Sequence, residues 1–189
     1  MCAALAAQES GASVTVLERA PEDESGGNTR FTAGSIRFAY SGVEDLRELM
    51  PDLPENEIAA TDFGTYTEDQ YFDDMFRVTQ YRCDPDLVEC LVRQSKETMF
   101  WMRDKGVRFI PIYGRQAFKI DGRFKFWGGL TVESVGGGPG LVDSLTKVCL
   151  SHGIEIQYDT RAVDLDTDGK RVTGVVARRG GERPETIPA

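Results

Sequence analysis

The fold is decided by the stretch Ser13-Val14-Thr15-Val16-Leu17-Glu18, a short run of β-branched and apolar residues that ends in an acid. This composition predicts a buried strand. Residues 1–10 are rich in alanine and predict a helix, which Gly11 ends. A small-residue helix, a glycine turn and a strand ending in an acid are typical of the second half of a dinucleotide-binding βαβ unit, where the acid accepts hydrogen bonds from a ribose. The same pattern also fits an ordinary α/β packing unit, so both interpretations stay open here.

The strand and the G-x-G-x-x-G turn that open such a unit are not in the sequence, which begins inside the predicted helix. We therefore expect the chain to be a piece of a longer protein, truncated at both ends. The strand at residues 13–18 would then have an open edge, and the sheet would need a complementing chain to complete it.

A second informative segment begins shortly after Glu18 and reads Ser25-Gly26-Gly27-Asn28-Thr29-Arg30-Phe31-Thr32-Ala33-Gly34-Ser35. Its two clusters of glycine and small residues allow a flat group to approach the main chain, and they leave backbone N–H groups able to point at that group. A flexible surface loop is the alternative interpretation. The position directly after the acid favours the binding loop.

These segments resemble the FAD-contacting part of the fumarate reductase/succinate dehydrogenase flavoprotein family. Within that family the resemblance is closest to tricarballylate dehydrogenase and related FAD-dependent oxidoreductases. It covers nearly the whole chain and rests on the order and spacing of several motifs. The motifs are Glu18-Arg19, Gly26-Gly27-Asn28-Thr29, Ala33-Gly34, Tyr66-Thr67-Glu68-Asp69-Gln70-Tyr71-Phe72-Asp73-Asp74, Phe100-Trp101-Met102-Arg103-Asp104-Lys105-Gly106-Val107-Arg108-Phe109, Gly136-Gly137-Gly138-Pro139-Gly140-Leu141-Val142, Gly153-Ile154-Glu155-Ile156 and Tyr158-Asp159-Thr160-Arg161-Ala162-Val163.

The resemblance implies that FAD is the cofactor. By it, Glu18 would bind the adenosine ribose, and Ala162 would place a backbone group against the adenine. Ser35 stands where many relatives carry a second glycine. The resemblance implies no catalytic residue in this chain, because in the family such residues lie beyond the point where it ends. The cofactor-binding residues implied are Glu18, Arg19, Gly26, Gly27, Asn28, Thr29, Ala33, Gly34, Ser35 and Ala162.

The fold class implied is α/β with α+β insertions, a partial Rossmann-like FAD-binding domain of the glutathione-reductase type that lacks its first strand. Residues 1–40 would form the partial βαβ unit and residues 41–135 an inserted helical and β-hairpin segment. Residues 136–189 would return to the FAD-binding domain. Residues 51–64 predict an irregular connection, and residues 180–185, directly after Arg179, predict a turn-rich tail.

The glycine loop Gly136-Gly137-Gly138 precedes a predicted helix, and two roles remain open for it. It could bind an anion at the N-terminus of the helix, or it could permit close packing there.

Charge and composition narrow the classes of partner. The 189 residues carry 22 Lys and Arg against 31 Asp and Glu, and the net charge is −9. This balance argues against binding to duplex DNA or an anionic membrane. Residues 41–90 hold 14 acids against three arginines, whereas residues 91–140 hold nine basic residues against four acids. The basic stretch is either a solvated face or a region that steers an anionic small molecule.

Four cysteines without metal-ligand spacing and a single histidine, His152, argue against a metal site and against nucleophilic hydrolase chemistry. No apolar run approaches the roughly 20 residues that a membrane span needs. We therefore expect a cytoplasmic protein with no membrane span and no nucleic-acid partner.

The function that the resemblance implies is an oxidoreductase acting on CH–CH bonds. It would transfer a hydride between flavin N5 and a carbon next to a carboxylate, in a small acid such as tricarballylate, fumarate or succinate. An electron-acceptor protein is a further expected partner. The alternatives are a non-catalytic fragment from a truncated or split gene and a ketosteroid-type flavin dehydrogenase. An NAD(P)-binding module is weaker, because it leaves the Gly-Gly-Asn segment unexplained.

Overall fold

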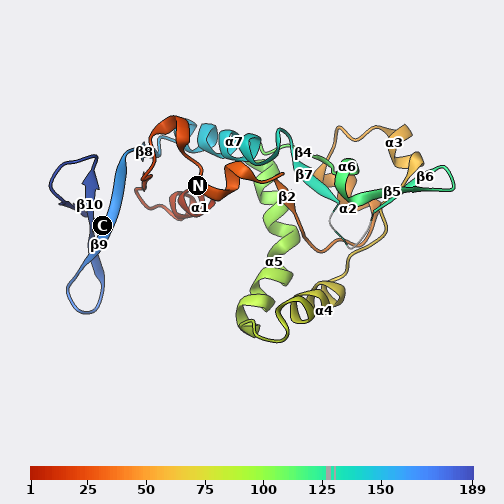
Figure 1. Cartoon of the computed structure of the whole chain (residues 1–189), viewed down its shortest axis with the longest axis horizontal. Helices are drawn as coiled ribbons and strands as arrows, with labels where there is room; N and C mark the ends of the chain where they lie inside the picture. The colour runs from red at the N-terminus through yellow and green to blue at the C-terminus, as the bar shows by residue number, and fades with distance from the viewer. Residues whose placement is uncertain (127–128, 130) are drawn as a thin grey trace. The chain divides into compact units, whose positions relative to one another are not determined.

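The computed structural model describes residues 1–126, 129 and 131–189. The chain divides into two compact units. Unit 1 consists of residues 1–30 and 145–189, the red and blue ends of the ribbon in Figure 1, and unit 2 consists of residues 31–144.

Unit 1 contains a parallel pair of short strands, β1 (Thr15–Leu17) and β8 (Glu155–Gln157). Thr15 lies opposite Glu155 and Leu17 opposite Gln157. Parallel strands need a long crossover connection, and here the connection contains all of unit 2. The predicted strand is therefore confirmed, and its partner comes from the other end of the sequence.

Helix α1 (Cys2–Glu9) lies against the end of helix α7 (Gly137–Ser151) within unit 1. The Gln8 amide donates to the carbonyl of His152, and the hydroxyl of Thr146 donates to the sulfur of Met1. The apolar residues between these elements are almost fully buried; they include Leu5, Cys149 and Ile154. Ala4 of α1 is also buried, and small residues on a helix allow a neighbouring element to approach closely.

Unit 1 also contains an antiparallel sheet of β9 (Thr160–Thr167), β10 (Val172–Arg179) and β11 (Glu185–Pro188) in the order β11-β10-β9. The turn-rich tail predicted at residues 180–185 holds for residues 180–184, and β11, which was not predicted, begins at Glu185. Ile187 pairs with Val175, and Pro188 ends the strand opposite Gly174. Proline is tolerated at the end of an edge strand, so its presence does not exclude a strand.

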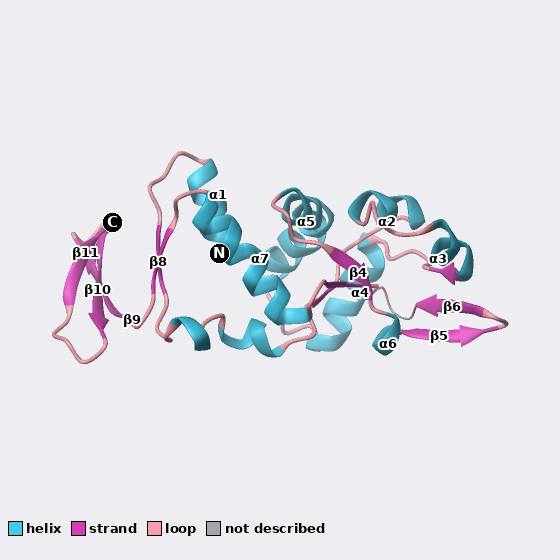
Figure 2. Ribbon diagram, turned by 90° about the horizontal axis from the view of Figure 1, so that it is seen from above, coloured by secondary structure: helices cyan, strands magenta, loops and turns pink. Residues whose placement is uncertain are grey.

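Unit 2 combines helices with two small sheets, and Figure 2 shows β5 and β6 as a hairpin. One sheet has the order β2-β7-β4 and the other the order β3-β6-β5. The strands are β2 (Ser35–Ile36), β3 (Thr61–Asp62), β4 (Phe109–Pro111), β5 (Ala117–Ile120), β6 (Arg123–Phe126) and β7 (Val132–Ser134). The helices of unit 2 are α2 (Val43–Leu49), α3 (Glu55–Ala60), α4 (Glu68–Thr79), α5 (Pro85–Asp104) and α6 (Tyr113–Gln116). Two 3-10 turns, η1 (Glu22–Glu24) and η2 (Gly27–Phe31), belong to unit 1 except for Phe31, the first residue of unit 2.

The predicted irregular connection at residues 51–64 was wrong, because it contains α3 and β3. Pro54 is the N-cap of α3, and Glu55 and Glu57 lie in its first turn, where acids interact favourably with the helix dipole. Strand β3 exists because Thr61 pairs with Phe124 of β6. That partner is distant in sequence, so local patterns carry no signal for it.

Helices α4 and α5 begin at clear capping signals. Thr67 and Gln70 form a capping box at the start of α4. The carboxylate of Asp84 accepts hydrogen bonds from the backbone N–H groups of Asp86 and Leu87, and Pro85 occupies the first turn of α5. The buried face of α5 carries Val88, Val92, Ser95, Met99 and Met102. Its Met and Val stripe is therefore core.

The turn after α4 contains two consecutive non-glycine residues in the left-handed region, Gln80 at φ 53° and Tyr81 at φ 58°. Gln80 is exposed and caps the helix. We expect Gln80→Gly to raise the free energy of unfolding by about 1 kcal/mol, because glycine adopts this conformation without steric cost. Urea unfolding measures the change. The matched control is Gln94→Gly in the exposed middle of α5, where glycine should instead lower stability by about 1 kcal/mol. Equal effects of the two substitutions would contradict the strain argument.

Candidate functional site

Glu18 stands directly after β1, half-buried, at the carboxyl end of a parallel strand. Its backbone N–H donates to Gln157, and its carbonyl accepts from the N–H of Thr160. One carboxylate oxygen, Oε1, accepts from the N–H of Ala20 at 2.8 Å. The side chain is therefore held in place by the main chain, while a carboxylate has acceptor capacity for further donors.

The predicted loop after Glu18 contains two glycines that need their conformational freedom. Gly26 has φ 102° and Gly27 has φ 52°, and a Cβ at Gly27 would meet open space. Asn28 and Thr29 are exposed in η2. The Arg30 guanidinium closes the loop by donating to the carbonyl of Ser25 at 2.6 Å. The backbone beside Gly27 is thus open to a neighbouring group.

The start of β9 lies next to Glu18 in unit 1, because Thr160 bonds to the Glu18 carbonyl. Ala162, two residues further along, is exposed and pairs with Ala177. Tyr158 lies nearby; burial, and then the negative charges of Glu22 and Glu18, raise its pKa. The structure therefore brings Glu18, the start of the 25–30 loop and the strand of Ala162 into one neighbourhood of unit 1. Arg19 is exposed beside them.

The remaining predicted residues, Ala33, Gly34 and Ser35, belong to unit 2. Gly34 is buried with φ 70°, and a Cβ there would overlap the hydroxyl of Ser134 and lie 2.7–2.8 Å from the carbonyl group of Gly137. The carbonyl of Gly34 accepts from the N–H of Ser134, and the N–H of Gly138 donates to Thr32. Ser35 begins β2 opposite Glu133. This segment is therefore packed tightly against the N-terminus of α7.

The glycine loop 136–140 has a packing role at this contact. A Cβ at Gly140 would overlap the carbonyl of Val135, and a Cβ at Gly137 would lie in van der Waals contact with the carbonyl oxygen of Ala33, at 3.4 Å. Of the two roles left open by the sequence, close packing is the one that these contacts show.

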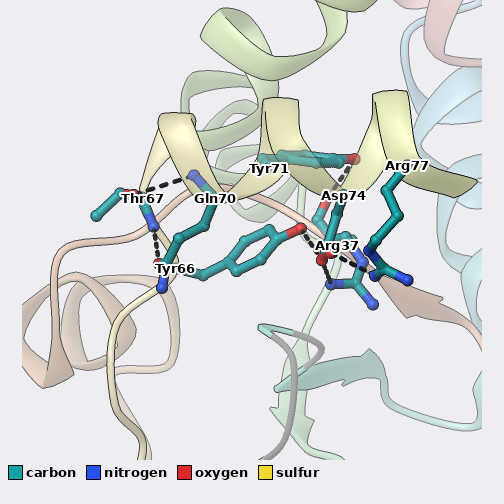
Figure 3. A network of polar contacts seen from close by, with 7 residues as sticks. All are labelled: Arg37, Tyr66, Thr67, Gln70, Tyr71, Asp74 and Arg77. Atoms are coloured by element: carbon teal, nitrogen blue, oxygen red, sulfur yellow. Dashed lines mark hydrogen bonds and ion pairs between the residues drawn. The ribbon is translucent and has the colours of Figure 1, made fainter. Parts of the chain in front are cut away.

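A polar network in unit 2 was missed by the sequence reasoning (Figure 3). The Tyr66 hydroxyl donates to Asp74 Oδ2 at 2.8 Å, and the Arg77 guanidinium donates to Asp74 Oδ1 at 2.6 Å. The Arg37 guanidinium donates to Asp74 Oδ2 at 3.4 Å and lies over the Tyr66 ring, 5.1 Å from its centroid. Hydrogen bonds from Arg77 and Tyr66 lower the pKa of Asp74, so the carboxylate is ionised. The only local sign of this network in the sequence is Arg37, two residues after the predicted Ala33–Ser35 segment.

The Tyr66 ring of this network also packs against the main chain at Gly129. Gly129, at φ 69°, lies against it, and a Cβ at that position would overlap the ring. Burial, followed by the hydrogen bond to Asp74, raises the pKa of Tyr66 to about 12, and burial likewise raises the pKa of Tyr40 to about 12.

The raised pKa values of Tyr40 and Tyr66 make the free energy of unfolding depend on pH in the alkaline range. The unfolded chain releases its phenol protons near pH 10, before the folded chain does, so we expect the stability that Tyr40 and Tyr66 contribute to fall as the pH rises from about 10 to 12. Thermal unfolding across this range measures the fall. Phenolate absorbance of the native protein should show Tyr40 and Tyr66 among the tyrosines that titrate later than in the urea-unfolded protein, which is the control. Titration of all six tyrosines together in the native protein would contradict the prediction.

A separate cavity of about 640 Å³ lies in unit 2 between the end of α2, residues 51–54 and β4. Its walls include Met50, Leu53 and Phe109, and Arg108 pairs with Asp52 beside it at 2.8 Å.

Across the described residues, His, Cys, Asp and Glu side chains form no group of three that could hold a metal ion. None of the helices within the described residues is long and apolar enough to cross a membrane.

The residues in unit 1 fit the adenosine and phosphate portions of a dinucleotide. Glu18 offers a held carboxylate after a parallel strand, where ribose hydroxyls are bound in such folds. The positive-φ glycines 26 and 27 leave backbone accessible for a close approach.

Comparison with known proteins shows the family of the chain. The chain matches the FAD binding domain family over residues 1–187. It is 25% identical over 177 residues to a fumarate reductase (cytochrome) of Shewanella frigidimarina, covering 93% of this chain and 27% of that protein. It is 27% identical over 222 residues to an NADH:acrylate oxidoreductase of Vibrio harveyi, covering 94% of this chain and 21% of that protein. The chain thus spans about a quarter of the length of these relatives.

Solved structures show the same fold. The open conformation of a flavocytochrome c3 fumarate reductase superimposes with a TM-score of 0.69 at 22% identity, over 98% of this chain and 29% of that one. A 3-ketosteroid-Δ4-(5α)-dehydrogenase from Rhodococcus jostii RHA1 superimposes with a TM-score of 0.71 at 21% identity, over 99% of this chain and 41% of that one. The family match and these superpositions confirm the predicted mixed α/β fold of an FAD-binding domain. The chain belongs to the FAD binding domain family, and its cofactor is FAD.

Proposed function

We propose that the protein is an FAD-dependent oxidoreductase acting on a small carboxylic acid. The observation that carries the proposal is the family match over residues 1–187, together with relatives named for fumarate and acrylate. Both of those molecules are carboxylates with a C=C bond next to the acid group. Bound FAD supplies the hydride chemistry at its N5 atom, and the protein's part is to bind, orient and exclude water.

We further infer that the cofactor is held by Glu18, Arg19, Gly26, Gly27, Asn28, Thr29, Ala33, Gly34, Ser35 and Ala162. The held carboxylate of Glu18 supports its role as acceptor for the ribose hydroxyls. The positive φ of Gly26 and Gly27 supports a backbone contact at the loop.

Among small carboxylic acids we propose tricarballylate as the substrate, because the order and spacing of the sequence motifs most resemble tricarballylate dehydrogenase. We propose that a separate electron-acceptor protein takes part and that the protein works in the cytoplasm. We also propose that residues 1–40 and 136–189 form one FAD-binding domain, into which residues 41–135 are inserted. The parallel pairing of β1 with β8 supports this division, since it joins the two outer segments. A first strand supplied from outside the chain would lie on the open edge of β1.

Two measurements on the purified protein test the proposal. The first is the FAD content per chain after gel filtration; we expect one. The second is a flavin-absorbance assay in which oxidised protein is mixed with tricarballylate or succinate, and reduced protein with fumarate or acrylate. We expect at least one of these acids to change the flavin absorbance, and 4-androstene-3,17-dione to leave it unchanged. A response to the steroid alone would show a ketosteroid-type enzyme instead. A chain that retains no FAD would support the non-catalytic fragment.

A further inference from the structure

The turn that joins α4 to α5 exposes large apolar side chains between charged ones. We call residues 78–91 the acidic tip, because its exposed charged residues are one arginine, Arg82, and three acids, Asp84, Asp86 and Glu89. Its exposed large apolar residues are Val78, Tyr81, Leu87 and Leu91, of which Tyr81 is 80% and Leu87 69% exposed. Leu87 and Leu91 are four residues apart on α5, so they lie on the same face of that helix.

Local contacts hold the acidic tip in this exposed conformation. The Tyr81 N–H donates to the carbonyl of Phe76 at 2.9 Å, and the two rings stack with their centroids 5.8 Å apart. At the other side of the turn, the Asp84 carboxylate caps α5 by accepting from the N–H groups of Asp86 and Leu87. A surface that is already held in one conformation loses little conformational entropy when a partner covers it.

The β5–β6 hairpin is a second exposed surface of unit 2, and it has the opposite charge. We call residues 117–126 the basic hairpin, because they contain Lys119, Arg123 and Lys125 against one acid, Asp121. Ile120 lies opposite Arg123 and Phe118 lies opposite Lys125, and residues directly opposite on antiparallel strands share a face. Phe118 is 56% and Ile120 44% exposed. One face of the basic hairpin therefore combines apolar side chains with cations.

The acidic tip and the basic hairpin belong to the same unit but are far from each other on it. Figure 1 shows the turn between α4 and α5 and the β5–β6 hairpin at different ends of unit 2. The hairpin is fixed to the unit by the pairing of β6 with β3 and by a hydrogen bond of 3.0 Å from the Arg123 guanidinium to the Thr61 carbonyl. The buried face of α5 likewise fixes the tip. These complementary surfaces can therefore meet only between two copies of the chain.

We propose that a second copy of this chain is the partner of both surfaces, with the acidic tip of one copy bound to the basic hairpin of the next. The apolar side chains of the two surfaces supply the burial that drives association. The charges set the orientation, because two tips or two hairpins would repel each other. Since two different surfaces meet, each copy keeps one surface for a further copy, and the assembly grows until it closes into a ring.

Sedimentation equilibrium of the FAD-loaded protein tests this contact. We expect the mean mass of the wild type to rise above that of one chain at about 10–100 µM, the range of a weak interface, and to fall again at about 0.5 M salt. Lys119→Glu/Lys125→Glu reverses the charge of the hairpin, and Asp86→Lys/Glu89→Lys reverses that of the tip. Each double substitution should raise the dissociation constant at least about tenfold. Asp84 is left unchanged because it caps α5.

Mixing the two reversed variants is the decisive measurement. The acidic tip of one variant then meets the basic hairpin of the other, and the two reversed surfaces also match, so an equimolar mixture should regain the association of the wild type. The matched control is Lys170→Glu/Arg171→Glu, which makes the same change of charge in the exposed turn between β9 and β10 and should associate as the wild type does. FAD content and the thermal midpoint should be the same in every variant.

A wild type that keeps the mass of one chain over the whole concentration range would overturn the inference, and the two surfaces would then bind different proteins or none. Reversed variants that associate as the wild type does, or a mixture that does not regain the association, would also overturn it, because the contact would lie elsewhere. If a reversed variant does not fold, Lys125→Gln and Asp86→Asn replace it. Each of these must weaken association about threefold or more, while Lys170→Gln leaves it unchanged.

Discussion

Replacement of Gly34 by alanine is expected to lower the free energy of unfolding by about 2–5 kcal/mol. Two costs add. A left-handed φ of 70° costs a non-glycine residue about 1–2 kcal/mol, and overpacking costs a further 1–3 kcal/mol. The overlap cannot be relieved cheaply, because the new Cβ would meet the backbone of Gly137 as well as the hydroxyl of Ser134. Urea unfolding followed by circular dichroism measures the loss.

Gly64→Ala separates the two costs. Gly64 has a similar φ of 60°, belongs to the same unit, and has open space where its Cβ would stand. Its substitution should cost only the conformational part, about 1–2 kcal/mol. If both variants lost the same stability, the close contact between the 32–35 segment and α7 would not be the reason for glycine at position 34.

The second large effect is on cofactor affinity. We expect Glu18→Ala to raise the dissociation constant of FAD about 100-fold and Glu18→Gln about 10-fold. A hydrogen bond to a charged group contributes about 1.5–3 kcal/mol, and glutamine keeps an acceptor oxygen but not the charge. Titration of FAD into the apoprotein, followed by isothermal calorimetry, measures both values.

Glu24→Gln is the control for this experiment, because Glu24 is an exposed acid in η1, within the same connection between β1 and the glycine loop. It should leave the affinity for FAD unchanged. Glutamine at position 18 can still accept from the N–H of Ala20, so the apoprotein should keep its stability in Glu18→Gln. Wild-type affinity in both Glu18 variants would remove Glu18 from the ribose site.

Several features of the fold could be predicted because their causes are local. The capping box of Thr67 and Gln70 and the Asp84–Pro85 start of α5 lie next to the helices that they begin. The apolar run before Glu18 predicts β1, and alanines predict α1. Strands β3 and β11 escaped prediction for the opposite reason, since each is defined by a partner strand rather than by its own composition.

The candidate functional residues also fall into those with a local signal in the sequence and those defined by distant partners. Glu18 and the glycines that follow it could be proposed as cofactor-binding residues from residue type and spacing, and the family match shows that the cofactor is FAD. The polar network around Asp74 could not be found in this way, because an arginine two residues after a small-residue segment does not indicate its partners. Tyr66 and Asp74, which contact Arg37, come from a loop and a helix about 30–40 residues away.

The sequence by itself determined helices α1, α4, α5 and α7, the acid at the end of the first strand and the positions of the flexible glycines. These features depend on capping, on periodicity and on backbone conformation, each of which acts over a few residues. Only the tertiary structure decided that β1 pairs with β8, that Gly34 packs against α7 and that two arginines share Asp74. Those contacts join residues far apart in the chain, and their stability comes from packing and pairing that exist only once the chain has folded.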